Sequence, residues 1–235
     1  MHIDLNCDLG EGAPHDAELM PLVTSANIAC GAHAGDEATM KRCIDLALAH
    51  GTAIGAHPGY EDRENFGRTE LTLSSSDLRV LVLGQIRMLQ NIAVQATTRL
   101  THVKPHGALY NQAARDPMIA SAIADAIYEA DPTLVIYGLA GSELIRAGKA
   151  RGLSTAREIF ADRRYQPDGN LVPRSHPHAL ITDTAEACAQ TLRLIRQGIA
   201  DTVCLHGDGA HAVAFAHALR HALQEAGIPI KRFTP

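Results

Sequence analysis

Six short apolar runs of this chain end in the same way, at a group of titratable side chains. In chain order they are DLNCDLGEG, NIACGAHAGD, AIGAHPGY, HVKPHGALYN, EIFADRRY and TVCLHGDGAH, and all except EIFADRRY also contain glycine near that end. The strands of a parallel α/β fold point their carboxyl ends to one face, and that face holds the active site. The repeated pattern therefore predicts a parallel α/β fold with its functional site at the strand ends.

Segments of helical periodicity separate these runs. Asp36, Asp116 and Asp183 are suitable N-cap residues, and apolar residues recur at helical spacing after each of them. A further apolar run at 134–141 brings the count to seven strands, and each but the first is expected to precede a helix. Strand ends spread over a whole sheet converge more naturally in a closed barrel than in an open sheet. We therefore predict an α/β fold, a seven-stranded (β/α) TIM-like barrel, with an open doubly wound sheet as the alternative.

The chain has no linker or low-complexity segment, so we expect residues 1–235 to form a single catalytic barrel. The net charge is −5 with interspersed charges, and no nucleic-acid partner is expected. No apolar run approaches the roughly 20 residues of a membrane helix, so no membrane partner is expected. The chain starts directly in a predicted strand, and its five cysteines include no CxxC pair. These features predict a cytoplasmic protein in a reducing compartment.

Charged and imidazole side chains at the predicted strand ends are candidates for catalysis. Imidazole titrates near neutral pH and suits proton transfer or metal ligation, whereas a carboxylate there is a base, a ligand or a turn cap. Lys104 and His106 flank a proline in a turn, so we expect neither to contribute much to the core. The candidate catalytic residues are Asp8, His33, His57, Lys104, His106, His206 and Asp208.

Further polar residues in the same segments are candidates for holding a substrate. Arg163 can bind a carboxylate or a phosphate through two hydrogen bonds, although Arg164 and Arg174 compete for that role. Tyr110 is either a pocket residue or a core residue. The candidate substrate-binding residues are Asn6, Glu11, Asp36, Tyr110, Asp162 and Arg163.

The spacing of possible ligands leaves a catalytic metal open. Asp8, His33 and His57 would form a site of two histidines and one carboxylate. The chain has no HExxH motif or other closely spaced ligand pair. It also has no GxGxxG after a strand and no GxxxxGK[ST], so neither a dinucleotide site nor a phosphate-binding loop is predicted.

Six motifs together resemble the LamB/YcsF family, also described as the A component of 5-oxoprolinase. They are DLNCDLGEG, SANIACGAHAGD, GAHPGY, VKPHGALYN, EIFADRRY and CLHGDG, in the family's order. The resemblance implies a seven-stranded barrel of the glycoside hydrolase/deacetylase type. It also implies ATP-dependent opening of 5-oxoproline, a lactam, to glutamate with two partner subunits, B and C. The partners would bind the ATP, which would explain why this chain has no phosphate loop.

Two other functions stay open from the sequence. The superfamily suggests a stand-alone, metal-dependent deacetylase or amidohydrolase, which would need neither ATP nor partners. The other is a non-catalytic subunit of the complex. The density of titratable residues at strand ends argues against a non-catalytic subunit, since a scaffold does not need such residues there.

Overall fold

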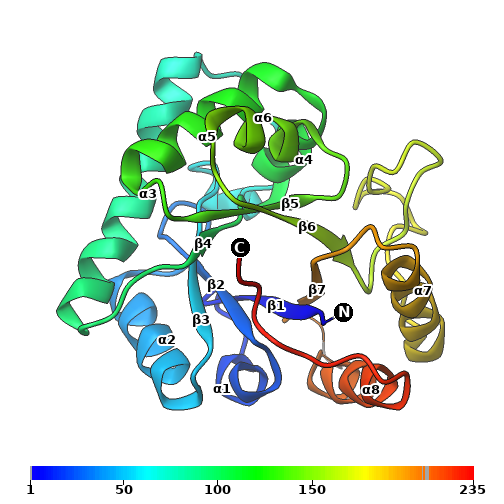
Figure 1. Ribbon diagram of the computed structural model, residues 1–235. Coiled ribbons are helices and arrows are strands. Elements are labelled where there is room, and N and C mark those ends of the chain that lie inside the picture. The colour runs from blue at the N-terminus through cyan, green and yellow to red at the C-terminus, as the bar shows by residue number, and fades with distance from the viewer. Residues whose placement is uncertain (1, 208, 210–211) are drawn as a thin grey trace.

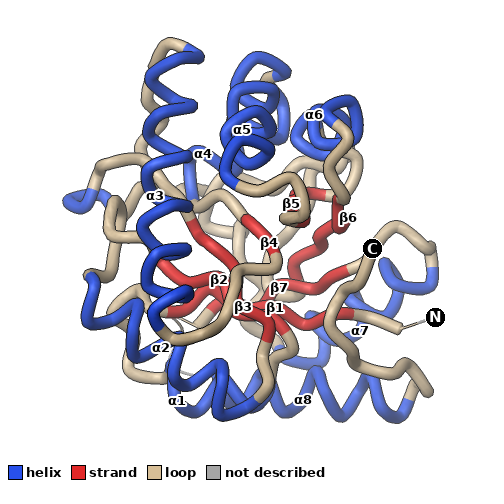
Figure 2. The backbone as a smooth tube through the Cα atoms, turned by 60° about the vertical axis from the view of Figure 1, so that its left-hand side comes forward, coloured by secondary structure: helices blue, strands red, loops and turns tan. Residues whose placement is uncertain are grey.

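The computed structural model describes residues 2–207, 209 and 212–235, and within them it confirms the predicted barrel. The strands are β1 (Asp4–Leu9), β2 (Ser25–Ala29), β3 (Ala53–His57), β4 (His102–Val103), β5 (Val135–Leu139), β6 (Thr155–Phe160) and β7 (Thr202–His206). All pairings are parallel and follow chain order, and β1 closes the ring by pairing with both β2 and β7. The strands lie at the centre of the molecule with helices around them (Figure 1; Figure 2).

The helices differ from the sequence prediction at two places. A one-turn helix follows β1, where none was expected, and two helices follow β4, because a helix begins at Gly107 before the one that Asp116 caps. The bounds are α1 (Asp16–Leu19), η1 (Met20–Leu22), α2 (Glu37–His50), η2 (Arg63–Asn65), α3 (Ser75–Gln95), α4 (Gly107–Arg115), α5 (Pro117–Ala130), α6 (Glu143–Arg151), α7 (Thr184–Arg196) and α8 (Ala212–Glu225). Among the described residues, no helix is long and apolar enough to cross a membrane.

The predicted N-caps are confirmed. The carboxylates of Asp36, Asp116 and Asp183 each accept a hydrogen bond from a backbone N–H in the first turn of α2, α5 and α7. Each cap satisfies a donor that the start of a helix leaves without an intrahelical partner. The caps therefore account for where these three helices begin.

The two faces of the barrel strands differ in polarity. On β1, Leu5 and Cys7 belong to the main apolar core. Asp4, Asn6 and Asp8 alternate with them, are buried as well, and make side-chain hydrogen bonds. Because successive side chains of a strand point to opposite faces, the polar set lies inside the barrel and the apolar set faces the helices. Next to β1, the barrel interior is therefore a polar network.

A long connection, residues 161–183, joins β6 to α7 and projects beside the barrel in the yellow part of Figure 1. It folds back on itself through two antiparallel bridges, Arg163 with Leu180 and Tyr165 with Leu171. Leu171 lies in the buried apolar cluster that contains Phe160, the last residue of β6. This connection is therefore anchored at the strand ends, where the functional site was predicted.

Candidate active site

Lys104 lies inside the barrel. The residue is 1 % exposed, and its ammonium is 2.8 Å from a carboxylate oxygen of Asp8 and 3.0 Å from one of Glu158. It also donates to the sulfur of Cys204 at 3.0 Å and to Asn6 at 3.3 Å. A lysine is buried this deeply only where charged partners replace water. His106 is also buried, so the expectation that Lys104 and His106 contribute little to the core is wrong for both.

Amide and imidazole groups hold the carboxylates of this network in place. Asn27 donates to Asn6 and to Asp8, each at 2.8 Å, and Asn6 donates to Glu158 at 2.9 Å. His102 Nε2 lies 2.8 Å from the amide oxygen of Asn27, and burial lowers the pKa of His102 to about 3. His102 is therefore a neutral donor, and both ends of the Asn27 amide have partners.

The two charges at the centre of the network stabilise each other. Burial alone would raise the pKa of Asp8, but His57 and Lys104 outweigh it and hold that pKa well below its ordinary value. Burial would likewise lower the pKa of Lys104, but the neighbouring charges, led by Asp8, hold it well above its ordinary value. Near neutral pH the site therefore contains a fixed ammonium and a fixed carboxylate.

Three histidines surround Glu11 and form the second part of the site. A ring nitrogen of His33, His57 and His106 lies 3.1, 3.5 and 3.0 Å, respectively, from Glu11 Oε1. His33 and His106 are stacked, with ring centroids 3.7 Å apart, and both meet His57 edge to face. We call these four residues the Glu11 cluster. His57 ends β3 and His106 immediately precedes α4, so two parallel βα junctions meet here.

Backbone carbonyls determine which nitrogen carries hydrogen in two of these rings. His57 Nδ1 is 2.7 Å from the carbonyl oxygen of Lys104, and His106 Nε2 is 2.8 Å from that of Phe66. A carbonyl oxygen only accepts, so each of these nitrogens is a donor. The other nitrogen of each ring faces Glu11.

Two glycines make room for the stacked rings. A Cβ at Gly59 would lie 2.7 Å from His33 Nδ1, and a Cβ at Gly67 would lie 2.8 Å from His33 Cβ. Gly67 also has a φ of +64°, a conformation that side chains with a Cβ rarely adopt. The loop between β3 and α3 can therefore approach His33 and His106 only because these positions lack a side chain.

The three imidazoles of the Glu11 cluster differ in how easily they are protonated. Burial lowers the pKa of His33 to about 4, and it also lowers the pKa of His106, so both rings are neutral near pH 7. His57 differs because Asp8, 3.4 Å from its Nε2, and Glu11 outweigh burial and raise its pKa. The nitrogen His57 Nε2 is therefore where the cluster most favours a cation.

His206 and Asp162 form a separate pair at the end of β7. His206 Nδ1 is 2.8 Å from one carboxylate oxygen of Asp162 and 2.9 Å from the other, so it donates to that carboxylate. Burial opposes ionisation of Asp162, but the electrostatic interaction and the hydrogen bond with His206 outweigh burial and lower the pKa of Asp162. In the neutral form of the His206 ring, Nε2 is the acceptor nitrogen, and the residue lines the cavity.

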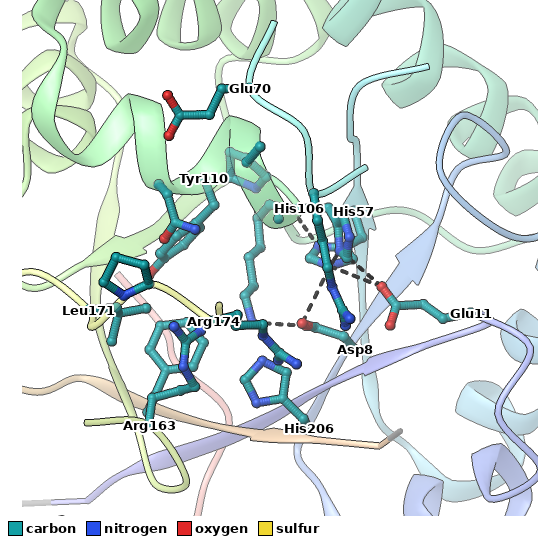
Figure 3. Close-up of a pocket in the computed structure, with 18 of the residues that line it drawn as sticks. Asp8, Glu11, His57, Glu70, His106, Tyr110, Arg163, Leu171, Arg174 and His206 are labelled. Atoms are coloured by element: carbon teal, nitrogen blue, oxygen red, sulfur yellow. Dashed lines mark hydrogen bonds and ion pairs between the residues drawn. The ribbon is translucent and has the colours of Figure 1, made fainter. Parts of the chain in front are cut away.

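A cavity of about 450 Å³ connects these groups, a volume within the range of small-molecule sites. In Figure 3, Asp8, Glu11 and His57 lie on one side, whereas Arg163 and Leu171 lie on the other. The first side comes from strand ends and the segments directly after them, and the second from the connection between β6 and α7. The cavity is therefore bounded by acid–base groups opposite a cationic and apolar surface.

Arg163 is buried on that second side. The residue is 3 % exposed and donates to the carbonyl of Val172 at 2.7 Å, while its Nε has no hydrogen-bond partner among the described residues. Burial and the neighbouring Arg174 lower the pKa of Arg163 to about 10, so the guanidinium is still charged near neutral pH. A buried charged donor without a partner suits an anionic group of a ligand.

Comparison with known proteins identifies the family. The LamB/YcsF family model matches residues 3–235. The chain belongs to the LamB/YcsF family. A lactam utilization protein from Thermus thermophilus is 40 % identical in sequence, with coverage of 99 % of this chain and 100 % of that one, and a TM-score of 0.92. The resemblance inferred from six motifs and the barrel prediction are both confirmed.

A more distant structure shares the fold alone. The catalytic domain of a peptidoglycan N-acetylglucosamine deacetylase from Eubacterium rectale is 13 % identical, with coverage of 99 % of this chain and 88 % of that one, and a TM-score of 0.56. This agrees with the deacetylase-type barrel that the family resemblance implied.

The LamB/YcsF barrel brings most of the candidate residues to one cavity. Those that line it are Asp8, Glu11, His57, Lys104, His106, Tyr110, Arg163 and His206. Three others contact lining residues from behind: Asn6 binds Lys104, His33 binds Glu11, and Asp162 binds His206.

One of the two remaining candidates lies elsewhere, and the other cannot be placed. Asp36 is not among the residues that line the cavity, and its carboxylate caps α2 by accepting from the backbone N–H of Thr39. Asp208 lies outside the described residues.

Sequence reasoning missed Glu158 and Cys204, which both contact the Lys104 ammonium. Each lies within a predicted apolar strand, where no functional residue was expected. A usable signal was the alternation along β6, where Ala156, Glu158 and Phe160 share one face and a charged residue therefore points toward the barrel interior. Tyr110 donates to Glu158 at 2.7 Å, so it is a pocket residue that also supports the ion network.

Proposed function

We propose that this chain is the A component of an ATP-dependent 5-oxoprolinase and opens the lactam ring of 5-oxo-L-proline to give L-glutamate. Subunits B and C would be its partners and would bind the ATP. Membership of the LamB/YcsF family and similarity to a lactam utilization protein support a lactam as the substrate class. No phosphate-binding loop occurs in this sequence, which supports placing ATP on the partners.

The buried Arg163 guanidinium is the observation that favours 5-oxoproline over an uncharged lactam. The substrate carries one carboxylate and one cyclic amide. The Nε of the Arg163 guanidinium has no hydrogen-bond partner among the described residues, and Arg163 lies opposite the acid–base groups around Asp8 and His57 (Figure 3). A carboxylate bound at Arg163 would present the amide to those groups, and a substrate without the carboxylate would leave the buried charge unpaired.

Amide resonance makes the ring carbonyl a poor electrophile, so the reaction needs activation. The partners would transfer the terminal phosphoryl group of ATP to the amide oxygen and release ADP. In the cavity, water would then add to that carbon, and a general base would take its proton. The carbon–nitrogen bond would break as the nitrogen is protonated. The resulting acyl phosphate would be hydrolysed to glutamate and inorganic phosphate.

The geometry suggests a role for each charged group. His206, oriented by Asp162, is a suitable general base, because its Nδ1–H is held and its Nε2 can accept a proton from water. The Lys104 ammonium would stabilise negative charge on the oxygens of the tetrahedral intermediate. Asp8 would keep that ammonium charged and in place.

The division of labour is tested by purifying this chain and the two partners separately. The chain alone, with ATP and 5-oxoproline, should release no ADP and no glutamate. The three subunits together should release ADP, phosphate and glutamate in equal amounts. ATP turnover by this chain alone would contradict the proposal, as would glutamate formation by subunits B and C without it.

A stand-alone amide hydrolase is the second candidate, favoured by the Glu11 cluster. Carboxylate and imidazole groups packed this closely can hold a catalytic metal, and such an enzyme would need neither ATP nor partners. Hydrolysis of N-acetyl or lactam substrates by the isolated chain without ATP would favour this candidate. Absence of that activity, with ATP-coupled ring opening in the complex, would exclude it.

A further inference from the structure

Three donor atoms of the Glu11 cluster are mutual neighbours. Glu11 Oε1 is 3.5 Å from His57 Nε2 and 3.0 Å from His106 Nδ1, and these two nitrogens are 3.0 Å apart. An ion bound at about 2.0–2.1 Å from each donor holds neighbouring donors about 2.8–3.0 Å apart in a right-angle arrangement and about 3.3–3.4 Å apart in a tetrahedral one. The triangle therefore has the size of one face of a metal coordination shell.

The hydrogen bonds on the far side of both rings leave this triangle without a proton donor when the rings are neutral. His57 Nδ1 donates to the Lys104 carbonyl and His106 Nε2 donates to the Phe66 carbonyl. Two nitrogen lone pairs and a carboxylate oxygen then face one another, which is repulsive unless a positive charge lies among them, either a proton on His57 Nε2 or a metal ion. Imidazoles held by carbonyl oxygens on their outer nitrogen are the usual arrangement of metal ligands.

His33 belongs to the cluster without being a ligand. Its ring is parallel to that of His106 within 1°, with centroids 3.7 Å apart, so an ion in the plane of one ring lies well outside the plane of the other. His33 Nε2 is 3.1 Å from Glu11 Oε1 and donates to it, which turns the carboxylate toward the other two rings. His33 is therefore a positioning residue.

A second group of possible ligands, Asp8, Cys204 and His206, does not compete. The Lys104 ammonium lies 2.8 Å from Asp8 and 3.0 Å from Cys204, so a positive charge already occupies the space between them. Burial also raises the pKa of the Cys204 thiol well above its ordinary value, so it is protonated and a poor ligand. The Asp8–His33–His57 set suggested by the sequence is not one close group among the described residues: Asp8 Oδ1 binds Lys104, and although Asp8 Oδ2 lies 3.4 Å from His57 Nε2, Asp8 is not grouped with His33.

We propose that Glu11, His57 and His106 bind one divalent first-row transition-metal ion, such as Zn²⁺, beside the cavity. All three residues line the cavity, so the ion has an open side toward a ligand or water. The donor set of two imidazoles and one carboxylate suits Zn²⁺, Fe²⁺, Ni²⁺ and Co²⁺ better than Mg²⁺ or Ca²⁺. The inference goes beyond the proposed function, because it holds whichever amide is cleaved.

The test measures metal binding directly. The untagged chain is stripped with a chelator, equilibrated with Zn²⁺ or Co²⁺ and passed through a desalting column before its metal content is measured. We expect about one ion per chain, and visible Co²⁺ absorption bands typical of nitrogen and oxygen ligands. A wild-type chain that retains no ion from micromolar metal would overturn the proposal.

Matched variants locate the ion. Glu11→Gln and His106→Asn should each weaken metal affinity by more than about a hundredfold, whereas His33→Asn should weaken it by about 10–100-fold and keep one ion per chain. His206→Asn, a cavity histidine outside the triangle, should bind as wild type does. Equal binding by Glu11→Gln and wild type, or loss of the ion in His206→Asn, would contradict the assignment.

X-ray absorption of the Co²⁺-loaded wild type covers the case in which a ligand variant does not fold. Two imidazole ligands and oxygen in the remaining positions would support the site, and a sulfur ligand or an imidazole count of zero would overturn it. None of these measurements depends on ATP, on partners or on turnover. A failure of ring opening and a failure of metal binding are therefore separate results.

Discussion

The Lys104 ammonium and the Glu158 carboxylate lie 3.0 Å apart inside the barrel, although the first follows β4 and the second lies on β6. Asp8 contacts the same ammonium from β1. One cation thus joins three parts of the ring that do not pair with one another through backbone hydrogen bonds. The ion pairs of Lys104 are therefore expected to stabilise the closed barrel as well as to set the charges at the candidate site.

Removing the cation should destabilise the fold. Lys104→Met removes the ammonium that the buried Asp8 and Glu158 share, and we expect the free energy of unfolding to fall by about 3–5 kcal/mol in urea titrations. Adding Glu158→Gln should restore part of the loss. Lys41→Met is the control, since Lys41 pairs with Glu37 on an exposed surface and should change stability by less than about 0.5 kcal/mol. Equal losses in the two single variants would argue against a structural role for Lys104.

Arg163 should determine the preference for a substrate carboxylate. In the reconstituted complex, Arg163→Met should lower kcat/KM for 5-oxoproline by about 10–100-fold, the effect of losing a charge-assisted hydrogen bond. Turnover of 2-pyrrolidinone, which lacks the carboxylate, should change far less. Arg164→Met is the matched control, because Arg164 pairs with Glu186 at the surface. If Arg163→Met lowers kcat/KM equally for both lactams, Arg163 supports the loop and does not bind the substrate carboxylate.

The free energy of unfolding should depend on pH through the ionisation of Asp162. The folded-state pKa of this carboxyl is lowered, so its stabilising contribution is fully present above the unfolded pKa of about 3.9 and is lost as pH falls through the folded pKa. The difference in free energy of unfolding between wild type and Asp162→Asn should therefore be largest from about pH 5 to 7 and should shrink below about pH 4. Urea titrations at several pH values measure this. If the difference in free energy of unfolding between wild type and Asp162→Asn grows toward acid pH, the pKa of Asp162 is not lowered by folding.

Gly67 should be required for the stacked histidines. Gly67→Ala adds a Cβ 2.8 Å from His33 Cβ at a φ of +64°. Gly51→Ala is a matched control, since its φ is +68° and a Cβ there meets nothing within 4 Å. Backbone strain should cost about 1 kcal/mol in both variants, and the steric contact should make Gly67→Ala clearly worse in thermal unfolding. Metal affinity should fall in Gly67→Ala alone.

Most of the fold could be predicted because its signals are local. Short apolar runs mark the strands one at a time, and N-cap carboxylates with helical spacing after them mark the helices. The helix that begins at Gly107 was missed because its N-cap residue, His106, is not one of the residue types that usually mark a helix start. Barrel closure followed from the spread of charged strand ends around the sheet.

The internal pairing of the site could not be predicted in this way. Lys104 lies 96 residues from Asp8 along the chain, so neither local pattern nor spacing relates the two. Glu11 is a second case: it was expected to contact substrate, but its neighbours His57 and His106 come from two other βα junctions. The strand ends predict which side chains lie on the same face of the barrel, but which of these side chains contact one another depends on how the ring of strands closes.

The 161–183 connection gives the cavity two sides with different origins. Asp8 and His57 lie on strands that pair with a neighbour on each side, whereas Arg163 and Leu171 belong to a segment outside the sheet. Because this segment lies outside the sheet, we expect insertions and exchanges in it to leave the strand register unchanged. Chimaeras that swap residues 161–183 between relatives should therefore change the Arg163 side of the cavity while Asp8 and His57 keep their positions.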